Sequence, residues 1–190
     1  MRALRKFDKA FCLPAKRTGE REAAKEAVAA LGLRGSAGER MLEWALGAAS
    51  RLADGLRYVI NQDQYDKLCM RTCRDLLREW RGERGEKLGF GAASRAVDLL
   101  MMALAESSSC RRESATGFLR SPLDSRTLAP LRRIVDQLTD VDFSIDIPAK
   151  PGSGYVASEE LYYILQGAVA ELARRAETAQ ITYAYWCAAG

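Results

Sequence analysis

Histidine is entirely absent from this sequence of 190 residues. Its absence excludes hydrolases that rely on a Ser-His-Asp or Cys-His arrangement, metal sites with imidazole ligands, and nucleases that need a histidine base. Any catalysis must therefore use carboxylates, lysines, tyrosines, cysteines or an unusual cofactor.

Long apolar runs and paired cysteines are also missing. No uninterrupted apolar run reaches the ~18 residues that a membrane span needs, and the apolar residues 11–14 are too few for a secretory signal. The five cysteines have no paired spacing, and Cys69 and Cys73 have no histidine or further cysteine nearby to complete a zinc site. We therefore expect a cytoplasmic protein without a bound metal, a disulfide framework or a membrane partner.

The remaining composition is that of an ordinary globular protein, with 48% hydrophobic and 28% charged residues. A chain of this length is most simply one domain, so we expect a single domain over residues 1–190. Its first part, residues 1–18, is expected to form a basic arm.

Helical periodicity dominates the chain, which predicts a mainly α-helical fold with at most a small β-hairpin or two short strands. The expected helices cover residues 20–31, ended by Gly32, and a segment capped by Ser36 that Gly55 interrupts. Further helices are expected after Asn61, after Gly91 and after Ser158. Residues 143–147 and 181–187 have the alternation or composition of strands, which predicts a pair of short strands.

Positive charge is concentrated in the second quarter and middle of the chain. The formal net charge is +4, and residues 81–133 alone carry ten basic against six acidic side chains, a balance of +4. Arginine, which suits bidentate phosphate contacts, provides most of this charge. The window therefore indicates either a nucleic-acid face or a set of ordinary solvated helix faces.

Residues 88–133 form the stretch around which the chain is organised. Gly89-Phe90-Gly91 forms a glycine-rich turn before an apolar helix, and Ser121-Pro122-Leu123-Asp124 has the chemistry of a second helix start. With Ser121 as the N-cap and Pro122 at the first helical position, Asp124 would occupy the third. A carboxylate there is either a common capping group or an anion held beside a developing positive charge.

This pair of motifs is similar to the arrangement in the helix-hairpin-helix superfamily of DNA glycosylases, and to bacterial antiphage glycosylases that act on modified cytosines. The resemblance covers about a quarter of the chain and implies that Gly89 and Gly91 hold a DNA phosphate, while Asp124 supports cleavage of the N-glycosidic bond. The hairpin lies further from the aspartate than is usual in that family, and the family's lysine has no counterpart except Arg95. The implied partner is double-stranded phage DNA, and no cofactor is expected.

A glycosylase needs an aromatic pocket for the flipped base and a basic rim for the distorted backbone. Each aromatic residue also has an alternative place in the hydrophobic core. The pocket candidates are Tyr65, Trp80, Phe90, Phe118 and Tyr155. The DNA-binding candidates are Lys87, Gly89, Gly91, Arg95, Arg111, Arg112, Arg120 and Arg126.

Asp98 is the second catalytic candidate, because it is a carboxylate on an otherwise apolar helix, beside Val97 and Leu99. One interpretation is a structural ion pair with Arg95, three positions earlier. The other is a pocket acid that accepts a hydrogen bond from a cytosine amino group or a sugar hydroxyl.

Two other classes of function fit parts of the same pattern. A non-enzymatic helical module of a phage-defence system would bind DNA or protein with the same arginines and would not need a fixed Asp124. A helical toxin-type ribonuclease fits less well, because the usual catalytic histidine is missing.

Overall fold

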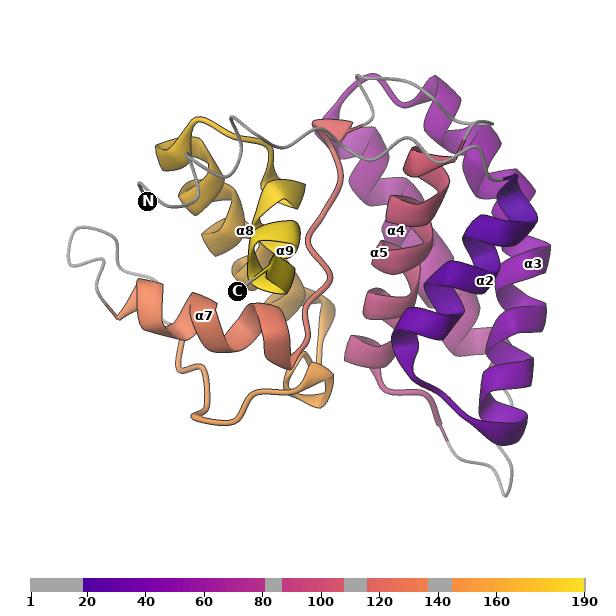
Figure 1. Cartoon of the computed structure of the whole chain (residues 1–190), viewed down its shortest axis with the longest axis horizontal. Helices are drawn as coiled ribbons and strands as arrows, with labels where there is room; N and C mark the ends of the chain where they lie inside the picture. Colours follow the sequence, from indigo (N-terminus) through magenta and orange to yellow (C-terminus); the bar gives the residue numbers. More distant parts are fainter. Residues whose placement is uncertain (1–18, 81–86, 108–115, 137–144, 190) are drawn as a thin grey trace.

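The computed structural model describes residues 19–80, 87–107, 116–136 and 145–189. Within these ranges the chain forms seven α-helices and one 3-10 turn, and it has no strand (Figure 1). The expectation of a mainly α-helical fold is therefore confirmed. No helix in the described ranges is long and apolar enough to cross a membrane. The basic arm expected at residues 1–18 lies outside them.

Among the described helices, α2 (Glu20–Leu31), α3 (Gly35–Tyr58) and α4 (Gln62–Glu79) pack against α5 (Phe90–Glu106) in one group, which Figure 1 shows in indigo to pink. Leu52, Leu76, Leu100 and Met101 are almost completely buried between them. The face that α2 buries consists of alanines, whose small side chains let its backbone come close to its neighbours.

The last three helices form a second group, shown in orange to yellow in Figure 1. They are α7 (Ser125–Val135), α8 (Glu159–Ala176) and α9 (Gln180–Ala189). Before α7, an extended segment that includes Leu119 and Ser121 passes between the two groups. It is held by buried side chains: Ser121 Oγ donates to the Gln180 carbonyl at 3.0 Å, and Gln166 Nε2 donates to the Ser121 carbonyl at 2.8 Å.

Three helix ends follow the predicted capping chemistry. Gly32 ends α2 in the left-handed conformation, with φ of 71°. Asn61 Oδ1 accepts from the backbone N–H of Gln64 at 2.9 Å, and Ser158 Oγ accepts from that of Leu161 at 3.2 Å.

Two predictions about α3 are wrong. Ser36 is not its N-cap, because the helix already begins at Gly35 and Arg34 precedes it without a side-chain cap. Gly55 does not interrupt it either, since α3 continues to Tyr58. A Cβ at Gly55 would lie only 2.9 Å from Leu68 Cδ2, so the lack of a side chain at Gly55 lets α4 pack closely against α3.

The expected C-terminal strand is also wrong, because residues 181–187 belong to α9. Ile181, Thr182 and Tyr183 are buried there, and their packing outweighs the strand preference of β-branched and aromatic residues. Of the other expected strand, residues 143 and 144 lie outside the described ranges, and residues 145–147 have no regular structure.

Gly91, in the first turn of α5, lies close against the backbone of residues 153–156. The 3-10 turn η2 (Ser153–Tyr155) packs against α5 at this point. A Cβ on Gly91 would lie 1.8 Å from the carbonyl oxygen of Ser153 and 2.8 Å from that of Val156. Only glycine fits here, because both obstacles are backbone atoms.

Candidate functional site

Asp124 is the N-cap of α7, and not the third residue of a helix that begins at Pro122. Its Oδ1 accepts from the backbone N–H groups of Arg126 at 2.8 Å and Thr127 at 3.3 Å. The Asp124 N–H in turn donates to Thr127 Oγ1 at 2.9 Å, which completes a capping box. The carboxylate thus lies at the helix N-terminus, as predicted, but as the N-cap itself and not at the third helical position.

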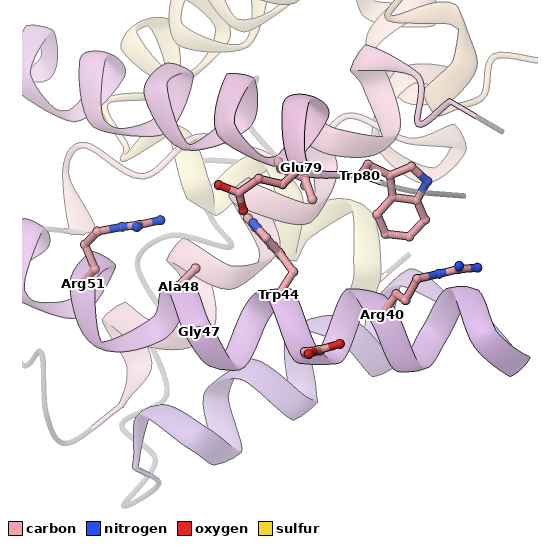
Figure 2. Close-up of a pocket in the computed structure, with 9 residues that line it drawn as sticks. Arg40, Trp44, Gly47, Ala48, Arg51, Glu79 and Trp80 are labelled. Carbon is pink, nitrogen blue, oxygen red and sulfur yellow. The ribbon is translucent and has the colours of Figure 1, made fainter. Parts of the chain in front are cut away.

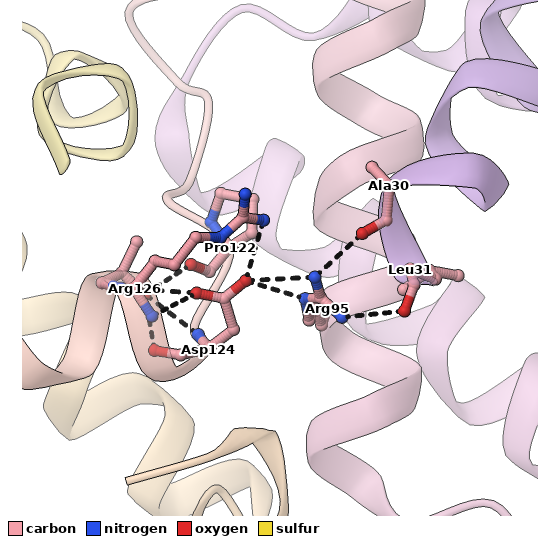
Figure 3. A network of polar contacts seen from close by, with 7 residues as sticks. Ala30, Leu31, Arg95, Pro122, Asp124 and Arg126 are labelled. Atoms are coloured by element: carbon pink, nitrogen blue, oxygen red, sulfur yellow. Dashed lines mark hydrogen bonds and ion pairs between the residues drawn. The ribbon is translucent and has the colours of Figure 1, made fainter. Parts of the chain in front are cut away.

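The second carboxylate oxygen of Asp124 accepts hydrogen bonds from two guanidinium groups (Figure 3). Arg95 Nε donates to Oδ2 at 3.1 Å, and Arg126 Nη2 donates to it at 3.2 Å. Arg95 also donates to the carbonyls of Ala30 at 3.0 Å and Leu31 at 3.4 Å, near the C-terminal end of α2. Arg95 therefore connects the negative end of α2 with the carboxylate that caps the positive end of α7.

A small pocket opens beside this carboxylate. Its volume is about 130 Å³, and helices α5, α7 and α9 supply its walls. The lining residues are Leu99, Met102, Pro122, Asp124, Arg126, Thr127, Ala184, Tyr185 and Ala188. The pocket thus combines one fixed carboxylate, one exposed guanidinium and one aromatic side chain with apolar walls, the usual composition of a small-ligand site.

Tyr185 is a pocket residue that the sequence did not indicate. Its hydroxyl donates to Glu106 Oε1, which anchors the ring between α9 and the end of α5. Burial and the contact with Glu106 raise the pKa of the Tyr185 hydroxyl well above its usual value. The strand prediction for residues 181–187 hid this role, because only a helix brings Tyr185 together with Ala184 and Ala188 at the pocket.

No family model, curated protein or solved structure matches this chain. Among the residues that the structure describes, no group of three or more Cys, Asp or Glu side chains could hold a metal ion.

The predicted DNA-binding arginines fall into three sets. Arg95 and Arg120 have side chains only 15% and 10% exposed, and both are paired inside the protein, Arg120 with Asp66 at 3.0 Å. Neither can serve as a phosphate contact in this arrangement. Arg126, with 62% of its side chain exposed, and Lys87 remain accessible. Arg111 and Arg112 lie outside the described residues.

The two hairpin glycines have different surroundings. Gly89 is the exposed N-cap of α5 and could approach a phosphate. Gly91 is buried beneath η2. It packs against the η2 backbone in this structure and is not exposed to a phosphate, as the hairpin prediction would require. The glycine turn is therefore a packing contact at Gly91 and an open helix start at Gly89.

The predicted aromatic pocket does not assemble. Tyr65 is completely buried in the core, which excludes it as a base-stacking side chain. Phe90 packs edge to face on Tyr162, with ring centroids 6.2 Å apart, and Phe118 is half-buried against the core. Trp80 lines a different pocket between α3 and α4, and the Tyr155 hydroxyl donates to the Asp146 carbonyl at 2.8 Å.

Asp98 is a buried structural acid. Only 1% of the residue is exposed, and its Oδ1 accepts from the Tyr162 hydroxyl at 2.9 Å. Within the described residues its Oδ2 has no hydrogen-bond partner. The expected pair with Arg95 is wrong, because Arg95 turns to Asp124 instead. Without access to solvent, Asp98 cannot act on a bound base in this structure.

Burial raises the pKa of Asp98 to about 8, against the lowering effects of the Tyr162 hydrogen bond and Arg120. Between about pH 4 and pH 8 the unfolded chain has therefore released a proton that the folded chain retains. Stability falls with rising pH across this window and levels off above it. The cost at alkaline pH is on the order of a few kcal/mol.

We expect Asp98→Asn to remove this pH dependence, because the neutral amide still accepts from Tyr162 and cannot ionise. At pH 8.5 the Tm of the variant should exceed that of the wild type by about 5 °C or more, and the two should converge near pH 4. Thermal unfolding followed by circular dichroism across this pH range provides the measurement. Parallel curves at every pH would show that Asp98 does not titrate in the fold.

Proposed function

We propose that this protein is a DNA N-glycosylase and that Asp124 is its catalytic carboxylate. The observation that carries the proposal is the fixed direction of Asp124, at the wall of a pocket of about 130 Å³. Two backbone N–H groups and two guanidinium groups hold the carboxylate, so it needs no reorganisation when charge develops beside it.

The chemistry suits a chain without histidine. When the N-glycosidic bond breaks, the base leaves with the bonding electron pair and positive charge develops on the sugar. A fixed anion stabilises that charge, and water then adds to the sugar carbon and releases a proton. Asp124 would provide the electrostatic part of this reaction, and the exposed Arg126 would contact a neighbouring phosphate.

The pocket size limits the base that can enter. A volume of about 130 Å³ corresponds to roughly four water molecules, which suits one pyrimidine ring. A glucosyl group on hydroxymethylcytosine of phage DNA would have to extend through the mouth of the pocket. Modified cytosine therefore remains the proposed substrate, with its substituent outside the cavity.

The second candidate function is a non-enzymatic DNA-binding module. It is favoured by the position of Asp124 at a helix junction, where the residue is only 8% exposed and both carboxylate oxygens already accept protein hydrogen bonds. In that case the carboxylate would only join α2, α5 and α7, and Arg126 would still bind phosphate.

One assay separates the two candidates. The protein is incubated with duplexes that contain cytosine, hydroxymethylcytosine or its glucosylated form. Released base is measured by mass spectrometry, and abasic sites by strand cleavage in hot alkali. Base release from a modified duplex supports the glycosylase. Binding without release favours the module, and the absence of both contradicts both candidates.

Arg126→Gln tests the DNA contact by equilibrium binding, a measurement that requires no base release. Removing one phosphate contact should weaken binding to every duplex similarly and reduce the slope of log affinity against log salt by about 1. Arg71→Gln removes the same charge from an exposed position on α4 and should leave that slope unchanged. Identical slopes for both variants would remove Arg126 from the DNA face.

A further inference from the structure

A larger pocket lies between α3 and α4, apart from the Asp124 site. Its volume is about 420 Å³, within the range of small-molecule pockets, and it shares no lining residue with the pocket at Asp124. One face of α3 supplies residues at positions 40, 43, 44, 47, 48 and 51, which recur at helical spacing. Leu76, Glu79 and Trp80 at the end of α4 form the opposite side.

The side chains of this pocket are arranged around a floor of small residues. Gly47 and Ala48 lie in the middle of the α3 row, with Arg51 at one end and Arg40 at the other (Figure 2). Trp80 lies over the Arg40 end, where the guanidinium carbon is 5.9 Å from the centroid of its ring. The second indole, that of Trp44, lines the same cavity.

We propose that this pocket binds a nucleotide, with the base against the indoles and the phosphate on an arginine. Every nucleobase offers a flat π-face, and stacking on tryptophan contributes about 1–3 kcal/mol per base. Arg40 and Arg51 are donors suited to phosphate. Glu43 and Glu79, which also line the pocket, are acceptors for exocyclic amino groups.

The net charge of the lining residues limits which ligands the pocket can bind. The lining contains two arginines and two glutamates, so the pocket has no net charge and does not suit the dense phosphate row of a duplex. A ligand with hydrogen-bond donors, acceptors and only one or two phosphates fits better. This chemistry is shared by a free mononucleotide and by one nucleotide of a single strand. The inference does not depend on Asp124, because binding here requires no base release.

Gly47 makes the pocket testable without disturbing the fold. A Cβ at Gly47 would meet no atom within 4 Å, so Gly47→Leu fills the floor of the cavity without a backbone clash. Gly167 in α8 is an exposed helical glycine that is equally unobstructed, which makes Gly167→Leu the matched control. Both changes should leave the protein folded, because leucine has a better helix propensity than glycine.

The experiment follows tryptophan fluorescence in a Trp186→Phe background, which leaves only Trp44 and Trp80 of the three tryptophans. The probes are dCMP, dAMP, deoxycytidine and a ten-residue oligonucleotide of deoxycytidine, which is unstructured at neutral pH and carries the same base as dCMP. We expect saturable quenching by the mononucleotides, and binding of deoxycytidine at least about tenfold weaker, because it lacks the phosphate that the arginines contact. Gly47→Leu should weaken nucleotide binding at least about tenfold, and Gly167→Leu should not change it.

The two sources of the ligand are distinguished by the oligonucleotide. Tighter binding of the oligonucleotide than of mononucleotides identifies a single strand as the ligand, and equal or weaker binding identifies the free nucleotide. Absence of saturable quenching by all four probes would overturn the proposal. Quenching that Gly47→Leu leaves unchanged would overturn it too, because the ligand would then bind elsewhere.

Discussion

Asp124→Asn is expected to reduce base release by at least about a hundredfold while most of the DNA affinity remains. The amide oxygen can still accept from the N–H groups of Arg126 and Thr127, so the helix stays capped. The charge that stabilises the developing cation on the sugar is lost, and this loss acts on the transition state and not on the bound substrate. Single-turnover release and equilibrium DNA binding should be measured on the same preparation.

The same substitution is also expected to lower the stability of the protein. The amide NH₂ takes the place of Oδ2 and faces the donors of Arg95 and Arg126, at a cost of roughly 1–3 kcal/mol. Arg95 keeps its two carbonyl acceptors on α2, so the variant should still fold. Its folded fraction at the assay temperature must be determined from its melting curve.

Ser121→Ala is the matched control for this experiment, because Ser121 is buried but does not line the pocket. It removes the hydroxyl that donates to the Gln180 carbonyl at 3.0 Å, while the Asp124 carboxylate and its partners remain. Comparable destabilisation with nearly full base release is expected. Equal loss of release in both variants would mean that Asp124 acts through structure alone, and wild-type release by Asp124→Asn would refute the catalytic assignment.

Gly91→Ala is expected to produce the largest loss of stability. The new Cβ would lie 1.8 Å from the Ser153 carbonyl oxygen, and this neighbour is backbone that cannot rotate away. Either η2 must leave α5 or the first turn of α5 must shift, and we expect a cost of about 3 kcal/mol or more. Urea unfolding followed by circular dichroism should show a clearly lower midpoint.

Gly167→Ala provides the comparison, since its Cβ meets no atom within 4 Å. In the interior of α8 this change should stabilise the protein by roughly 0.5–1 kcal/mol. If Gly91→Ala instead keeps the wild-type midpoint but loses DNA affinity, Gly91 contacts phosphate as the hairpin resemblance implies. The packing role assigned to it here would then be wrong.

The sequence predicts a helix end correctly where the capping residue acts on its immediate neighbours in the chain. Gly32, Asn61 and Ser158 act within one turn of the chain, so the sequence alone was sufficient to predict their roles. α9 was missed because the burial of Ile181 and Tyr183 depends on distant helices. A strand preference measured along the chain contains no information about those contacts.

The site was harder to predict because its contacts join distant positions. The sequence places Asp124 at a helix start, yet its partner Arg95 lies 29 positions earlier, where local spacing favours a pair with Asp98 instead. Asp98 meets Tyr162 across 64 positions. Charge and spacing indicate which side chains need partners, but only the packing of α5 against the other helices selects them.

The two partners of the Arg95–Asp124 ion pair leave the ribosome at different times. Synthesis proceeds from the N-terminus, so α2 and α5 leave the ribosome before residue 124. Arg95 can already donate to the carbonyls of Ala30 and Leu31 at that stage. We expect the folded N-terminal helices to present this cation until Asp124 emerges, when the docking of α7 neutralises it.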